Sequence, residues 1–362
     1  MISEVTSRPH KFTVYQPVYR LGERLERYYA ISRTVTGALK VILKSRIHRL
    51  PHAAFGASIE ITDRCNAGCN YCYVYPSEWT QTQRMAGYLN LSTHEHREQE
   101  KQVFATLARL HRQGIVHVTL IGGEPLLASK IIYKAAKLFP VVWVVTNGAA
   151  KHPVNLPRSV VMSVSIDGPP DLHNRTRDPS GFFAKQQYGY LTGMSAAIAR
   201  NINESERGAF VHITLTQQSL SQFPATVDWL VTDLTKLRGI MVSGAATTSS
   251  DRSQALEIED KQLIKQMIKD AADRYGWQLF PFNQPLVNSY LFDPEYVITN
   301  PAQCTVARRV DSIGFDGNIV GKCVLRDQTD CTTCACNLTG LMRAVSAQDK
   351  PSIAGLWRSC FG

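Results

Sequence analysis

The sequence has 362 residues, of which 44% are hydrophobic and 19% are charged, and a formal net charge of +10. This composition is typical of a soluble globular protein with one large or two smaller domains, and it excludes a disordered chain. No apolar run is long enough to span a bilayer, and the first ten residues lack the apolar core of a secretory signal, so we expect a cytoplasmic protein.

The positive charge is concentrated in the first 57 residues, which hold ten Lys or Arg against three Glu. Apolar residues recur at helical spacing over 18–49, with basic residues between them, which predicts a basic helical extension over 1–57, built as two helices. Such a helix either docks on the parent domain or contacts an acidic partner or an anionic membrane surface, which would place the protein at the inner membrane periphery. We expect no nucleic-acid partner.

From residue 58 onward, β-rich runs alternate with helical patterns, which is typical of a parallel α/β sheet with right-handed crossovers. The predicted strands cover 58–62, 115–121, 141–146, 160–166, 210–216 and 239–243. The predicted helices cover 93–113, 129–139, 183–200, 221–237 and 257–275. We assign residues 58–245 to this core, 246–300 to a helix with an irregular connection, and 301–362 to a cysteine-rich region.

Nine cysteines occur in two groups that lie far apart in the sequence. In a reducing compartment, grouped cysteines indicate metal ligands rather than disulfides. Cys65, Cys69 and Cys72 follow the first predicted strand, and three thiolates suit a [4Fe–4S] cluster whose fourth iron is open to a small molecule. Two alternatives are a structural zinc site that pairs Cys69 and Cys72 with a downstream Cys-x2-Cys, and buried thiols without a ligand.

Further motifs follow the next three strands, and the carboxyl ends of parallel strands are where such folds build their sites. The second strand ends in Gly122-Gly123-Glu124-Pro125, where paired glycines allow close backbone approach and the carboxylate suits an ammonium group. Thr-Asn-Gly follows the third strand at 146–148, and Ser-Ile-Asp-Gly-Pro ends the fourth at 165–169. Each motif alone is weak evidence, but their order is more specific.

The whole series, from Cys-x3-Cys-x-Tyr-Cys to His173 and Arg177, resembles the radical S-adenosylmethionine (radical SAM) core of enzymes with SPASM or twitch auxiliary-cluster domains. The resemblance implies a partial (β/α)6 barrel in which SAM is reductively cleaved to a 5′-deoxyadenosyl radical that abstracts a hydrogen atom from the substrate. It implies three ligands of the [4Fe–4S] cluster, namely Cys65, Cys69 and Cys72. It also implies contacts with the adenine, amino group, ribose and carboxylate of SAM by Tyr71, Gly122, Gly123, Glu124, Ser165, Asp167 and Arg177.

The cysteine-rich region resembles the SPASM or twitch layout of a cysteine, a hairpin turn at 315–318, a second cysteine and a later group. It departs from that layout because the gap from Gly317 to Cys323 is one residue longer and the last group is compressed. Counting Cys360, six cysteines suffice for one auxiliary [4Fe–4S] cluster, while zinc and two incompletely ligated clusters are alternatives. The candidate ligands are Cys304, Cys323, Cys331, Cys334 and Cys336.

Peptide or protein modification is the commonest role in this branch, so by analogy we expect a peptide substrate. The short basic extension does not resemble a winged-helix leader-binding domain, which favours the alternative of a small molecule, sugar or lipid near a membrane. A zinc protein without catalysis is a third interpretation, but it leaves the glycine and acidic motifs unexplained. The family chemistry also implies an electron donor such as flavodoxin or ferredoxin. No catalytic acid, base or radical donor stands out, and the class of enzyme, oxidoreductase or transferase, stays open.

Overall fold

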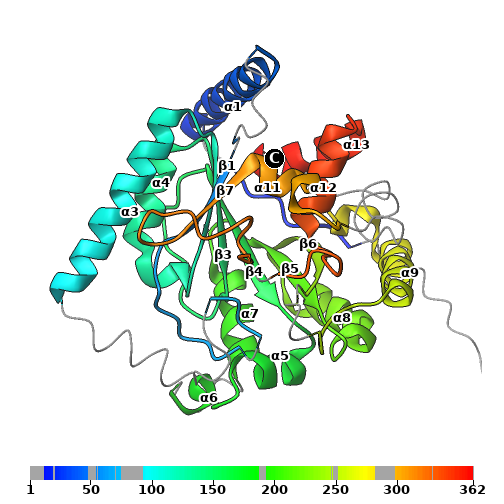
Figure 1. Ribbon diagram of the computed structural model, residues 1–362. Helices are drawn as coiled ribbons and strands as arrows, with labels where there is room; N and C mark the ends of the chain where they lie inside the picture. Colours follow the sequence, from blue (N-terminus) through cyan, green and yellow to red (C-terminus); the bar gives the residue numbers. More distant parts are fainter. Residues whose placement is uncertain are drawn as a thin grey trace, which may run out of the picture.

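The computed structural model describes residues 12–18, 21–47, 54, 56–69, 71–74, 93–186, 193–245, 247, 252–281, 298–327 and 329–361. Within them, seven strands form one parallel sheet in the order β6-β5-β4-β3-β2-β1-β7. The strands are β1 (Gly56–Glu60), β2 (His117–Ile121), β3 (Val141–Thr146), β4 (Val160–Ile166), β5 (Ala209–Leu215), β6 (Leu237–Gly244) and β7 (Val310–Ile313). Figure 1 shows this sheet curved within a ring of helices, which confirms the predicted α/β partial barrel.

The six predicted strands are all present, and two of them, β3 and β4, have the predicted bounds. Every residue of β4 is buried, as expected for a strand that is covered on both faces. The seventh strand, β7, was not predicted. It comes from the cysteine-rich region and pairs with β1, so that Gly56 lies opposite Val310. Four residues of mixed polarity carry no local signal for a partner strand so far away in the sequence.

Helices cover the outer face of the curved sheet, and the C-terminal helices α11 (Thr305–Arg309), α12 (Asn337–Ser346) and α13 (Lys350–Phe361) lie on its inner side (Figure 1). The other described helices are α1 (Leu21–Ile47), α3 (Thr93–Gln113), α4 (Ser129–Leu138), α5 (Pro170–Arg177), α6 (Phe182–Gln186), α7 (Met194–Glu204), α8 (Phe223–Asp233) and α9 (Ile258–Tyr275). None of the helices in the described part of the chain combines the length and apolarity needed to cross a bilayer.

Two helix predictions were wrong. Where two helices were expected over 18–49, the described residues 21–47 form one continuous helix, α1. The single helix predicted over 183–200 is divided into α6 and α7, and α5 precedes them without having been predicted. Gly193 immediately before α7 has φ 135°, where an added Cβ would lie 2.5 Å from the Asn174 amide, so a side chain is excluded at this break. Most of the predicted irregular connection, 282–297, lies outside the described residues.

The C-terminal helices α12 and α13 pack against the barrel near the amino ends of its strands. Trp143, Phe210 and Met241, from β3, β5 and β6, pack against Leu341 of α12 and Phe361 of α13. The stacked rings of Trp143 and Phe210 have centroids 5.8 Å apart. The cysteine-rich region is therefore packed into the barrel and contributes to its interior.

Candidate active site

The cysteine loop, defined here as residues 61–69 and 71–74, leaves the carboxyl end of β1 and borders a cavity of about 340 Å³ inside the barrel. All three predicted ligands of the first cluster line this cavity. So do the five thiols of the C-terminal cysteine group, Cys304, Cys323, Cys331, Cys334 and Cys336. Cys360 lies elsewhere, in the apolar cluster with Trp143. The fold therefore brings together eight of the nine cysteines and separates the ninth from them.

The Gly-Gly-Glu motif holds the cysteine loop through its backbone. The Gly123 amide donates to the Thr62 carbonyl at 2.8 Å, and the Glu124 amide donates to the Arg64 carbonyl at 2.5 Å. Gly122 has φ 130°, and a Cβ there would lie 2.4 Å from the Thr62 carbonyl oxygen. The close approach that requires this glycine is thus made by the cysteine loop itself.

Two more hydrogen bonds fix the middle of the cysteine loop. The Asn147 side-chain amide donates to Asn66 Oδ1 at 2.7 Å, and the Gly68 amide donates to the Arg177 carbonyl at 2.8 Å. Asn147 belongs to the Thr-Asn-Gly motif after β3, and Arg177 ends α5, which follows β4. Together with the Gly-Gly-Glu contacts, these bonds hold the loop against the ends of three neighbouring strand units.

Glu124 is completely buried, and its carboxylate joins the ends of β2 and β3. Oε1 accepts from the Leu126 amide at 2.9 Å and from Thr146 Oγ1 at 2.5 Å, and Oε2 accepts from the Asn147 amide at 2.7 Å. Burial raises the pKa of this carboxyl, although the three hydrogen bonds act in the opposite direction. Glu124 is not among the cavity-lining residues, so its predicted contact with an amino group stays a prediction.

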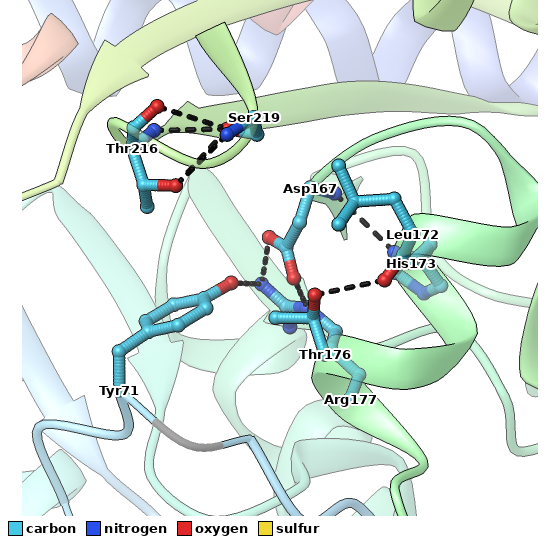
Figure 2. A network of polar contacts seen from close by, with 8 residues as sticks. All are labelled: Tyr71, Asp167, Leu172, His173, Thr176, Arg177, Thr216 and Ser219. Atoms are coloured by element: carbon cyan, nitrogen blue, oxygen red, sulfur yellow. Dashed lines mark hydrogen bonds and ion pairs between the residues drawn. The ribbon is translucent and has the colours of Figure 1, made fainter. Parts of the chain in front are cut away.

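Asp167 and Arg177 form a buried two-point ion pair beside the cysteine loop (Figure 2). Arg177 donates from Nε to Oδ2 at 2.6 Å and from a terminal nitrogen to Oδ1 at 2.8 Å. The same side chain donates to the Tyr71 hydroxyl at 3.2 Å. Burial alone raises the pKa of Asp167, but the Arg177 guanidinium outweighs burial and holds that pKa below its ordinary value.

Helix α5 supplies Arg177 together with His173, which lies one turn earlier on the same face. Pro170 at the first turn favours a helix start directly after the Ser-Ile-Asp-Gly-Pro motif. The Asp167 amide donates to His173 Nδ1 at 3.3 Å. Ser165, Tyr71 and Arg177 line the cavity, whereas Asp167 acts behind Arg177. The roles of these side chains toward SAM stay predictions.

The thiols of the cysteine loop are soft ligands of the kind that an iron–sulfur cluster takes. Burial raises the pKa of Cys65 well above its usual value, and the charges of Cys69 and Glu124 raise it further. Such thiols become thiolates when metal binding displaces their protons. In the part of the chain that the structure describes, no group of three or more His, Cys, Asp or Glu side chains is placed as the ligands of one metal ion.

The C-terminal cysteine group forms a second electrostatically connected set. Burial raises the pKa of Cys334 to about 12, and the neighbouring Cys336, Cys304 and Cys323 act on it. Burial likewise raises the pKa of Cys323 to about 11, with Cys336, Cys304 and Cys331 nearby. The donor set and its enclosure fit an iron–sulfur cluster.

Polar side chains on the inner face of the barrel were missed at the sequence level. The cavity is lined, below the cysteines, by Ser58, Thr119, His212, Thr214, Ser243 and Ser312. The signal was present in the alternation along β5, where Val211, Ile213 and Leu215 are buried in the core and the residues between them are polar. Asn66 was also missed, because its partner Asn147 is known only once the loop is placed.

Comparisons with known proteins agree with this architecture. The family model of the radical SAM superfamily matches residues 59–230. Human molybdenum cofactor biosynthesis protein 1 is 27% identical over 190 residues, which cover 49% of this chain and 27% of that protein. SuiB of Streptococcus suis bound to S-adenosylmethionine superposes with a TM-score of 0.53 at 14% identity, covering 80% of this chain and 64% of SuiB. SuiB bound to precursor peptide SuiA gives 0.52 at 15% identity, covering 85% and 68%.

Because the sequence identity to SuiB is only 14–15%, this likeness shows the fold alone. The chain spans less than two thirds of SuiB bound to S-adenosylmethionine and about a quarter of the human protein.

Proposed function

Because this chain belongs to the radical SAM superfamily, we propose that it cleaves SAM reductively and removes a hydrogen atom from a peptide or protein substrate. Cys65, Cys69 and Cys72 would hold a [4Fe–4S] cluster whose open iron binds the methionyl end of SAM. The observation that carries the proposal is the cavity that these three thiols share with the motif residues of β2 and β4 and the loops after them.

When bound, the cluster supplies the electron that splits SAM into methionine and a 5′-deoxyadenosyl radical. The residues of the chain itself would orient SAM and the substrate and exclude water from them. Asp167 fixes the guanidinium of Arg177 in the cavity wall, ready for an anionic group such as the SAM carboxylate. Gly123 and Ser165 line the same cavity. The cavity wall limits the access of water to the reacting carbon and holds the substrate hydrogen in place.

The C-terminal cysteine group would hold one auxiliary [4Fe–4S] cluster. Five thiols line the cavity, and four are enough for one cluster. Cys360 lies apart from these thiols, in the apolar cluster with Trp143 and Phe361, so we do not count it among the proposed ligands. An auxiliary cluster at the wall of the substrate cavity could exchange electrons with the substrate and with an external donor such as flavodoxin or ferredoxin.

The peptide substrate is supported by the shared architecture with SuiB, which has been captured with its precursor peptide and which this chain matches over 85% of its own length. Anaerobically reconstituted protein, incubated with SAM and dithionite, should release 5′-deoxyadenosine, measured by mass spectrometry. Omission of dithionite is the control. Absence of the nucleoside from protein with a full iron complement would contradict the proposal.

A small molecule or lipid near an anionic membrane is the second candidate, and helix α1 favours it. Leu25, Tyr28 and Leu39 on this helix are 68%, 70% and 60% exposed, an unusual exposure for large apolar side chains. Flotation of the full-length protein with phosphatidylglycerol vesicles would test it. Binding should be lost in Leu25→Ser/Leu39→Ser, and equal flotation of both proteins, or none of the wild type, would remove this support.

A further inference from the structure

His212 lies in the wall of the cavity, beside residues already assigned to the site. It is opposite Ser165 in the pairing of β4 with β5, and both side chains line the cavity. Its neighbours in the chain, Val211 and Ile213, are fully buried on the other face of the strand. The pleat of β5 therefore directs the imidazole into the barrel.

The imidazole is held in one orientation by a chain of hydrogen bonds. His212 Nε2 lies 2.7 Å from Ser243 Oγ, and the Asn337 backbone amide donates to the same oxygen at 2.9 Å. The Asn337 amide occupies one lone pair of Ser243 Oγ, and among the described residues Nε2 is the one acceptor in hydrogen-bond contact with the Ser243 hydroxyl. With the Ser243 proton donated to Nε2, the imidazole proton is on Nδ1. We assign this tautomer from the hydrogen-bond pattern.

The second ring nitrogen remains available. Among the described residues, none forms a hydrogen bond with Nδ1 of His212, and this atom is not one of the fully buried, unpaired polar atoms. Burial lowers the pKa of His212 to about 4, and the charge of Arg177 lowers it further while Asp167 opposes this. At neutral pH the ring is therefore an uncharged donor that faces the cavity.

The opposite wall has the same character. Ser58 on β1 is in register with Thr119 on β2 and with Ser312 on β7, and all three line the cavity. These three hydroxyl groups can pair with an uncharged polar group of the substrate, whereas the charged side chains of the lining, Arg177 and Lys322, are cations that suit an anion.

We propose that His212, oriented by Ser243, is a substrate-binding residue that donates a hydrogen bond from Nδ1 to an uncharged oxygen of the substrate, a peptide carbonyl or a hydroxyl. The inference rests on the proposed function, because it assumes that the cavity holds a substrate beside SAM. It places the recognised oxygen between the strands of β5 and β6 on one side and the hydroxyls of β1, β2 and β7 on the other.

The test uses deuterium transfer, which works even while the substrate is unidentified. Cells of the source organism grown on deuterated medium supply two probes, a peptide pool and a pool of small metabolites. Reconstituted holoenzyme is incubated with SAM, dithionite and either pool, and the deuterium found in 5′-deoxyadenosine is divided by the total nucleoside formed. The variants are His212→Phe, which removes the N–H group, His212→Gln, which keeps an N–H donor, and His117→Phe, which changes a half-buried histidine outside the cavity lining.

We expect this ratio to fall about tenfold or more in His212→Phe, the loss expected for one hydrogen bond in an enclosed site, and to stay within about threefold in His212→Gln and His117→Phe. Binding of the deuterium-donating molecules to immobilised protein, measured without dithionite, should be weakened in His212→Phe to a similar extent.

An unchanged ratio in His212→Phe overturns the inference about His212 and leaves the proposed function standing. Loss of all nucleoside from His212→Phe with full iron content overturns it too, because His212 would then serve SAM. Transfer only from metabolites contradicts the peptide substrate but still tests His212, whereas wild-type protein that cleaves SAM without transfer from either pool overturns both.

Discussion

The two cysteine regions line one cavity, but the fold positions them in different ways. The cysteine loop after β1 is held by backbone and side-chain bonds from motifs that follow β2, β3 and β4. The C-terminal cysteine group lies on a segment that joins the barrel through the pairing of β7 with β1 and through single contacts elsewhere. Arg326 donates to Glu60 at 2.8 Å, and the Gly244 amide donates to the Ala335 carbonyl at 2.9 Å.

This difference explains why one region carries a motif series and the other does not. When a loop is held by successive strand ends, the residues that hold it recur in a fixed order along the chain. Much of that series therefore describes how the loop is fixed, in addition to what it binds. Glu124 is the clearest case, since both of its oxygens are occupied by protein donors.

The largest predicted effect concerns that carboxylate. Glu124→Ala leaves three buried donors without an acceptor, and we expect a loss on the order of 4 kcal/mol in the free energy of unfolding. Urea unfolding and iron content per chain would measure it. Glu124→Gln keeps one acceptor oxygen and should lose less. A Glu124→Ala protein that is as stable and as iron-rich as the wild type, yet fails to bind SAM, would make Glu124 a ligand contact instead.

A smaller effect is expected at the contact of the second region. Glu60 is buried at the end of β1, while the side chain of its partner Arg326 is 34% exposed. Glu60→Gln should lower the free energy of unfolding by about 1–2 kcal/mol, because water can partly solvate the released guanidinium. Hydrogen exchange should rise around 323–327 and stay unchanged in the cysteine loop. Glu98→Gln, which alters a surface pair with Lys101, is the control, and an equal effect there would refute the prediction.

Acid should lower the stability of the barrel, which carries the cysteine loop, and of the C-terminal region at different pH values. Burial lowers the pKa of His117, His152, His173 and His212 to about 4, and the sequence has no histidine after position 212. The unfolded chain binds more protons than the folded barrel between pH 6.5 and 4, so stability falls as the pH decreases through this window. At pH 5.5 we expect a loss of roughly 1 kcal/mol per histidine.

In the C-terminal region, Asp316 and Asp330 have pKa values below the ordinary one, so their contribution is lost only as the pH falls below about 3.8. Hydrogen exchange at pH 7.5 and 5.5, corrected for intrinsic rates, should therefore show loosening of the barrel first. Simultaneous loosening of both regions would contradict this order.

The sequence was sufficient for features that depend on local pattern. Strand β3 is an apolar run that ends in Thr146, and β4 is an apolar run interrupted by Ser163 and Ser165. The spacing of Cys65, Cys69 and Cys72 placed them together on one loop. The alternation of strands and helices predicted the parallel sheet. These features need only neighbouring residues to be specified.

Features that depend on distant partners could not be predicted. Strand β7 is defined by its pairing with β1, and the ion pair of Asp167 with Arg177 requires α5 to fold back beside β4. The position of Cys360 apart from the other thiols depends on α13 packing into the barrel next to Trp143. No local pattern encodes these contacts, because each is decided by how the whole barrel closes.

The most direct test of the account compares two single thiols under the same SAM cleavage assay. Cys69 lies in the cysteine loop at the cavity, and Cys360 lies outside the cavity against the base of the barrel. The account predicts that Cys69→Ala forms no 5′-deoxyadenosine, while Cys360→Ala forms as much as the wild type. Undiminished nucleoside formation by Cys69→Ala would contradict it.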